Sequence, residues 1–336
     1  MAKRKSRGMR KIAPAVTDLF FTTKTGVNAH PAYYIDTMSE LSKVNRRLYS
    51  QSKMVAYQGL TFIWRASGSN PPAATDLASI EVTVRTAGNT WIMHNAFVKG
   101  KALWDEMQDL VLDDNPSVKG KWHDFKVTFS TEQTGTGAAG NTLVAKDAAG
   151  SDYLGGEWNY STYVMPQHDV DPATGLPLVA DEFDACLIGG DNVSRKSLVK
   201  AYQESRATVS PDQPNTPVGM PNSFFSLLTD SGSQEPELAT VIQDENENPP
   251  YSLDHYPQGD TNAPTAVVVQ YGAISASEVD GRVGPFVAPC GLLEIGVKGY
   301  DGTGQEITPD NLPAIDLLLH VAPGTYKGVA AINMGQ

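Results

Sequence analysis

The chain contains few cysteines and no long hydrophobic run. Of its 336 residues only 2 are Cys, and they do not form a CxxC pair. We expect Cys186 and Cys290 to be buried free thiols, because they lie far apart in apolar surroundings. No stretch approaches the length of about 18 apolar residues that a transmembrane helix needs, and the apolar start at residues 12–16 is too short for a signal peptide. These absences predict a soluble protein made in a reducing compartment.

Motifs that carry catalysis are also missing. The sequence has no nucleophile elbow, P-loop or kinase motif. Its 6 histidines are scattered, and only His168 clusters with two carboxylates, Asp169 and Asp171, within three residues. The prolines that follow favour a surface loop there over a metal site. The sequence therefore predicts no enzyme, no metal site and no cofactor.

Two segments match known motifs in form only. Residues 135–140 read GTGAAG, but the dinucleotide-binding fingerprint needs a helix opening on the last glycines, and a strand and a turn are expected here. We predict a loop. Residues 244–255 begin like a calcium loop, but Pro249 and His255 stand where Gly and a bidentate Glu are required. A cation bridging neighbouring subunits stays open beside a solvated acidic loop.

The charge is distributed unevenly. The formal net charge is −12, yet the first eleven residues carry six basic side chains and no acid. These are Lys3, Arg4, Lys5, Arg7, Arg10 and Lys11. An acidic body repels phosphate, so we expect nucleic acid to contact the basic arm alone. Nuclear targeting and a plain solvated tail are the alternatives for the same residues.

The pattern of apolar residues predicts a β-rich fold. A capping box at Thr37 and Glu40 introduces a helix over residues 38–48, and a second helix is expected over 103–111. About a dozen short strands are expected from alternating and β-branched runs. They lie at 54–65, 79–85, 91–98, 122–130, 142–146, 157–165, 182–189, 195–204, 266–276, 286–298, 314–322 and 325–332.

This order of elements favours an all-β fold, an antiparallel jelly-roll sandwich with long decorated loops and two short helices. A double jelly roll is the alternative, and it needs about twice as many strands as the eight of a single one. We assign residues 1–33 to the basic arm and an extended linker, and residues 34–336 to one shell domain. That domain contains a long irregular insertion near 205–265. Within the insertion, residues 223–228 (SFFSLL) are expected to form either an intersubunit contact or a local core patch.

Several segments look like parts of a known family. They are Gly155–Ser161 (GGEWNYS), Asn248–Tyr251 (NPPY) with Tyr256-Pro257, and Ala288–Leu292 (APCGL). They resemble capsid proteins of small circular single-stranded DNA viruses that encode a replication protein (CRESS-type). The resemblance implies a single jelly roll, self-assembly into an icosahedral shell, and location in the virion, with passage through the host nucleus during assembly.

The same resemblance implies two partners, further copies of the chain and a single-stranded DNA genome held by the interior arm. It implies no membrane partner and does not identify a host receptor. The arm here is shorter and less arginine-dense than in many members of the group, which implies weaker binding of the genome.

Two other classes of protein stay open. One is a β-sandwich carbohydrate-binding or adhesion module, in which exposed Trp91, Trp122 and Trp158 would be the binding platforms. The other is a glycan-active enzyme that uses a pair of carboxylates in a cleft.

Overall fold

The structure is a computed structural model of the chain. It describes residues 15–64, 77–120, 122–155, 158–165, 181–190, 194–204, 264–275 and 277–335. The predictions for the basic arm and for residues 205–263 therefore lie outside the described residues.

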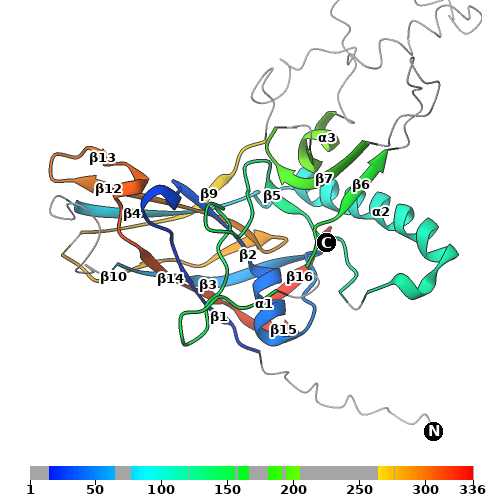
Figure 1. Cartoon of the computed structure of the whole chain (residues 1–336), viewed down its shortest axis with the longest axis horizontal. Coiled ribbons are helices and arrows are strands. Elements are labelled where there is room, and N and C mark those ends of the chain that lie inside the picture. Colours follow the sequence, from blue (N-terminus) through cyan, green and yellow to red (C-terminus); the bar gives the residue numbers. More distant parts are fainter. Residues whose placement is uncertain are drawn as a thin grey trace, which may run out of the picture.

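Two antiparallel sheets face each other and form most of the molecule (Figure 1). The six-stranded sheet runs in the order β1-β14-β3-β10, and β11 and β16 also pair with β3. Its strands are β1 (Asp18–Thr22), β3 (Lys53–Trp64), β10 (Asp280–Val283), β11 (Phe286–Pro289), β14 (Ile315–Val321) and β16 (Ala331–Asn333).

The five-stranded sheet runs in the order β13-β12-β4-β9, and β2 also pairs with β12. Its strands are β2 (Ala32–Asp36), β4 (Leu77–Thr86), β9 (Val267–Ser275), β12 (Leu292–Asp301) and β13 (Glu306–Ile307). The short strand β15 (Pro323–Tyr326) and the 3₁₀ turns at Gly26–Asn28, Pro116–Val118 and Pro309–Asn311 lie in the connections.

Strand pairing in the two sheets is nested along the chain. β1 pairs with β14, β2 with β12, β3 with β10 and β11, and β4 with β9. Each of these pairs is antiparallel, and the pairs alternate between the two sheets from the outside of the sequence inward. The protein is thus mainly β-sheet and forms an antiparallel sandwich, as predicted.

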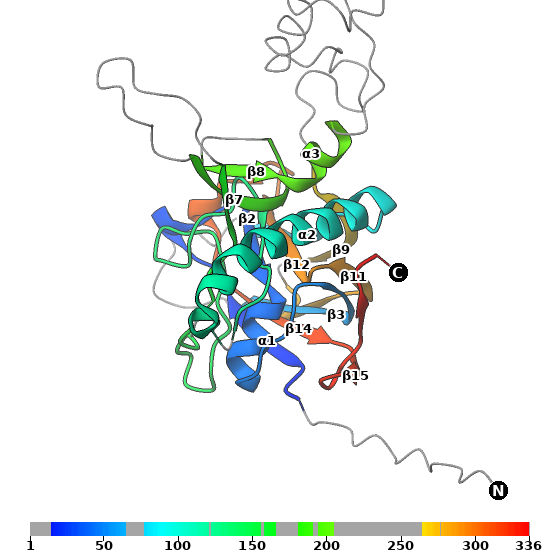
Figure 2. The same cartoon turned by 90° about the vertical axis from the view of Figure 1, so that its right-hand side faces the viewer.

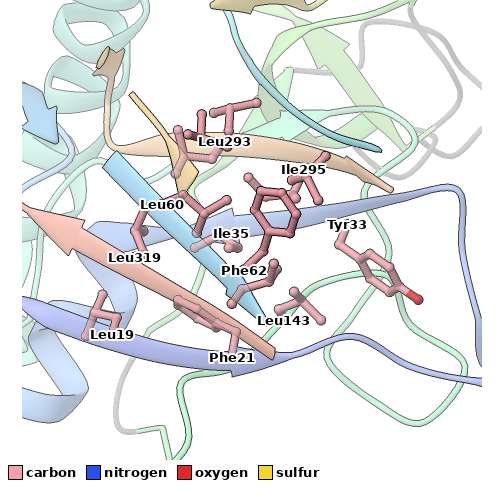
Figure 3. Close-up of a cluster of buried hydrophobic side chains, with 14 of the residues drawn as sticks. Leu19, Phe21, Tyr33, Ile35, Leu60, Phe62, Leu143, Leu293, Ile295 and Leu319 are labelled. Carbon is pink, nitrogen blue, oxygen red and sulfur yellow. The ribbon is translucent and has the colours of Figure 1, made fainter. Parts of the chain in front are cut away.

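A hydrophobic core fills the space between the two sheets (Figure 3). Strands alternate their side chains between two faces, so Tyr33 and Ile35 of β2 point into this core whereas Tyr34 points away from it. Phe62 of β3 and Leu293 of β12 meet them from the two sheets, and both are fully buried. The period of two in the sequence thus produces one continuous core.

The sandwich begins earlier in the chain than predicted. Residues 18–22 were assigned to an extended linker, but they form β1 at the edge of the six-stranded sheet. Leu19 and Phe21 alternate with polar or outward residues and are buried in the core. Two apolar residues two positions apart suffice for a short edge strand, and such a signal is too weak to read alone.

A second unit is inserted between β4 and β9. It consists of α2 (Trp91–Asp114), α3 (Leu198–Glu204) and a four-stranded sheet in the order β5-β7-β6, with β8 pairing with β7. These strands are β5 (Thr128–Ser130), β6 (Thr162–Met165), β7 (Asp181–Ile188) and β8 (Arg195–Ser197). Figure 2 shows α2 crossing in front of the sandwich, with β7, β8 and α3 beyond it. A second core joins this unit to Tyr34 and Leu292 of the sandwich.

The prediction of a strand over 91–98 is wrong, whereas the helix predicted over 103–111 is confirmed as part of a longer helix. The whole segment is one helix of 24 residues, α2, capped by Thr90, whose side chain accepts from the N–H of Met93. Met93, Phe97 and Trp104 are buried along one face of the helix. The β-prone residues at its start were misleading because packing against the second core decides their conformation. With α1 (Thr37–Asn45) and α3, the described residues hold three α-helices, not two short ones. None of the helices there is both long and apolar enough to cross a membrane.

Helix α1 (Thr37–Asn45) begins one residue earlier than predicted and ends three residues sooner. Its N-cap is Asp36, not Thr37, since the Asp36 carboxylate accepts from the N–H of Ser39 at 3.0 Å. The Thr37 hydroxyl accepts instead from the Tyr57 hydroxyl at 2.9 Å. The helix stops at Arg46, which adopts the left-handed conformation with φ of 53°.

Some predicted strands are shorter than expected. The run at 122–130 is a strand only at β5, and the run at 157–165 only at β6, within the described residues. The predicted strand at 195–204 is β8 followed by helix α3. Residues 142–146 make only isolated bridges, and 325–332 divides between β15 and β16.

Two predictions about special residues are confirmed. Residues 135–140 form turns with no helix, and the Lys24 ammonium binds the carbonyls of Gly137 and Gly140. Cys186 and Cys290 are buried free thiols.

Glycine is required at position 281 of β10. A Cβ there would lie 2.3 Å from Cζ of Phe62, its cross-strand partner, and 2.6 Å from Cγ2 of Ile274. We expect Gly281→Ala to lower the free energy of unfolding by about 1–3 kcal/mol, because the core has no room for the methyl group. Urea unfolding measures this. The control is Gly302→Ala, where a Cβ meets nothing within 4 Å and the change should stay within about 0.5 kcal/mol. Equal stability of the two variants would contradict the packing described.

Candidate functional site

The predicted nucleic-acid residues, Lys3 to Lys11, lie outside the described residues. So do residues 223–228, the calcium-like loop and His168. The sequence places the basic arm directly before β1, at the edge of the six-stranded sheet. The described residues form a cavity instead. Of its lining, the sequence predicted only Trp122 as a binding residue.

This cavity has a volume of about 520 Å³ and lies between the second half of α2, residues 120–126 and strand β6. We call it the tryptophan cavity. Its lining includes Trp104, Trp122, His123, Asp124, Lys126 and Glu182. Such a volume lies within the range of about 300–1,000 Å³ typical of small-molecule sites.

Aromatic rings form the apolar part of the wall. The Trp104 ring packs against His123, with ring centroids 5.0 Å apart and planes inclined by 32°. The Trp122 ring meets the edge of Trp158 at a centroid distance of 6.4 Å. Trp104 also contacts Phe125 of the second core, at 5.7 Å. Because these rings are held by one another and by the core, the wall is preformed.

The one buried ammonium in the lining, that of Lys126, is held by main-chain oxygens and an aromatic face. Lys126 is only 4% exposed. Its Nζ donates to the carbonyl oxygens of Trp122 and Asp124 and lies 5.0 Å from the Trp158 ring centroid. These contacts compensate the charge on burial.

Asp124 presents an oxygen whose hydrogen-bonding capacity is unused. Its Oδ1 accepts from the N–H of Phe125 at 3.0 Å. Its Oδ2 is buried and finds no hydrogen-bond partner among the residues that the structure describes. A buried acceptor without a donor is rare in folded proteins and calls for an explanation.

The histidine of the cavity is neutral at pH 7. Burial lowers the pKa of His123, and the nearby charges of Lys119 and Lys126 lower it further. Besides this histidine, the lining includes two carboxylate side chains, Asp124 and Glu182, and one ammonium side chain, Lys126.

A buried carboxylate, that of Asp36, fixes the residues beside the tryptophan cavity. Asp36 is 2% exposed, and its Oδ2 accepts from Nε2 of Gln51 at 2.9 Å, Nε1 of Trp158 at 3.0 Å and the hydroxyl of Tyr160 at 3.4 Å. Burial raises the pKa of Asp36 to about 6. Trp158 and Tyr160 belong to the segment 155–161 singled out in the sequence, so part of that segment is anchored by a carboxylate of β2.

Gln51 extends the same network into the inserted unit. Its Nε2 also donates to the carbonyl of Val127 at 3.2 Å, and its Oε1 accepts from the N–H of Val127 at 2.7 Å. The two bonds fix the orientation of the amide, so that only Nε2 can face Asp36.

Of the three tryptophans predicted as platforms, the structure brings two together. Trp122 and Trp158 meet beside the cavity, whereas Trp91 lies on α2, is 60% exposed and contacts Tyr202 at 6.4 Å. The sequence analysis missed Trp104, and it missed Asp124 and Glu182 as neighbours. No local signal could have found them, because they come from α2, a loop and β7.

Comparisons with known proteins give no relative. No family model, no curated protein and no solved structure matches the chain. Within the described stretches, no group of three or more His, Cys, Asp or Glu side chains is placed to hold a metal ion. The function is therefore argued from the fold, the charge and the cavity.

Asp36 should make stability depend on pH in an unusual direction. Its pKa rises from 3.8 to about 6 on folding, so the folded state binds the proton more tightly. Its contribution is present in full below about pH 3.8 and is lost as the pH rises through about 6. We expect the free energy of unfolding of the wild type, minus that of Asp36→Asn, to increase on going from pH 7 to pH 4, by on the order of 1–3 kcal/mol.

Urea unfolding of dilute, unassembled protein across this pH range measures the difference. Subtracting the variant removes the contributions of other carboxylates, including Glu40, whose pKa is also raised by burial. A difference that stays flat or shrinks as the pH falls would contradict the assignment.

Proposed function

We propose that the chain is a viral capsid protein, a single jelly roll that assembles into an icosahedral shell around nucleic acid. The observation that carries the proposal is the nested strand pairing, in which β1 pairs with β14, β2 with β12, β3 with β10 and β4 with β9. A jelly roll is a long antiparallel ribbon of this kind, folded into two facing sheets of a Greek-key sandwich.

Eight principal strands remain in the two facing sheets when β10 and β11 are counted as one strand and the short strands β13 and β16 are left out. One sheet then has the order first-eighth-third-sixth, and the other second-seventh-fourth-fifth. The third sheet supports a single roll over a double one, because its strand β7 is parallel to β5 and β8 and so it does not repeat the nested pattern. The third sheet lies between β4 and β9 in the chain, so it belongs to a long connection between two strands of the roll.

Self-association is supported by the exposed side chains of β9. This strand ends the order of the five-stranded sheet, and Val267, Val268 and Tyr271 are about half exposed along it. Exposed apolar side chains on an edge strand promote aggregation of a monomer, and in an assembly they supply contact surface between copies. We assign this edge to contacts between copies of the chain.

The distribution of charge supports the role of the arm. Without its six basic arm residues the chain has 20 basic and 38 acidic side chains. Nucleic acid is repelled by such a body and attracted by the arm, which would contact phosphates without reading sequence. A carbohydrate-binding module or a glycan-active enzyme remains the competing class, favoured only by the tryptophan cavity.

The first test is assembly of the full recombinant chain. We expect negative-stain electron microscopy to show closed particles, with absorbance at 260 nm in excess of that of the protein in the same fractions. Empty particles would support the shell and remove the packaging role of the arm. Protein that stays monomeric across salt and pH, with and without nucleic acid, would overturn the proposal.

The second test concerns the arm. We expect deletion of residues 2–11 to leave the fold intact and to weaken the binding of single-stranded DNA. Loss of six cations should reduce the slope of log affinity against log salt by about 4, since each phosphate contact with a single strand contributes about 0.7. A full-length chain with all six residues changed to Gln is the matched control and should behave like the deletion. An unchanged slope in both would exclude the arm as the DNA contact.

A further inference from the structure

We propose that the tryptophan cavity binds a neutral sugar ring. The inference goes beyond shell assembly and does not depend on it, because the whole lining comes from one copy of the chain. It concerns a ligand of the protein surface, and it holds for a monomer and a shell alike.

The wall offers the apolar surface that a sugar requires. One face of a pyranose ring carries axial C–H groups, and aromatic rings pack against such faces. Trp122 is half-buried at the cavity and keeps its position through the edge contact with Trp158, whose Nε1 is fixed by Asp36. A platform held in this way loses little entropy when a ligand stacks on it.

The polar groups of the lining match hydroxyl groups. Asp124 lines the cavity, and its buried Oδ2, which has no donor among the described residues, can accept from a sugar hydroxyl once the carboxylate turns toward the ligand. Glu182 and Asn159 are exposed at the same cavity and add an acceptor and an amide. A few convergent polar groups beside aromatic surface are the usual composition of a small-molecule site.

The carboxylates of the lining disfavour anionic ligands. Asp124 and Glu182 repel anions, so phosphorylated or acidic sugars and nucleotides are disfavoured. The ammonium of Lys126, held at the carbonyls of Trp122 and Asp124, opposes a second cation beside it. Together with the aromatic wall, these charges favour an uncharged ligand with hydroxyl groups.

The test is saturation-transfer NMR on the full chain, in its assembled and unassembled forms. The probes are methyl glycosides of glucose, galactose, mannose and N-acetylglucosamine, with glucose 6-phosphate and choline as charged comparisons. We expect transfer to the ring protons of at least one neutral glycoside. Transfer only to a charged probe, or to no probe in either form, would overturn the proposal.

Variants then locate the binding. Trp122→Ala should weaken the affinity for the glycoside about tenfold through loss of the platform, and Trp122→Phe should weaken it less. Asp124→Asn should also weaken it, because a neutral acceptor replaces a charged one. Trp91→Ala is the matched control, an exposed tryptophan outside the cavity, and should bind as the wild type does. Binding that Trp91→Ala abolishes and Trp122→Ala retains would contradict the assignment of the site.

Discussion

The carboxylate of Asp36 is the interaction on which the two halves of the structure depend. It ends β2, caps α1 and accepts from Gln51, Trp158 and Tyr160, which come from widely separated parts of the chain. A buried carboxylate is costly unless donors surround it, and these donors are in place only when sandwich and inserted unit are both folded. The network therefore couples the folding of the two units and makes their relative position part of the native state.

The two cores lie on opposite faces of the same strands, because neighbouring residues of a strand point to opposite sides. Tyr34 of β2 lies in the second core while its neighbours Tyr33 and Ile35 lie in the first, and Leu292 and Leu293 of β12 divide in the same way. A strand with both faces buried needs apolar residues on both. The unit inserted between β4 and β9 thus packs on the outer face of the sandwich. This packing supports the wall of the tryptophan cavity.

The sequence predicted what is encoded locally. The strands near 54–65, 79–85 and 314–322 were found because one face of each packs against the core and the alternation is visible. Helix α2 was misread at its start, because Trp91, Ile92 and Phe97 favour strands and only packing against distant residues makes them helical. The cavity could not be predicted from the sequence for the same reason. Trp104, Asp124 and Glu182 meet only through the tertiary fold.

In the proposed capsid, the charge distribution assigns nucleic-acid binding to the arm and contacts between copies to the body. The acidic body repels both nucleic acid and other copies of itself, so the contacts between copies in the proposed shell need apolar surface such as the edge of β9. Salt screens that repulsion and so favours contact between bodies, while the same salt weakens the contact of the arm with phosphate. The two steps of the proposed assembly thus respond to ionic strength in opposite senses.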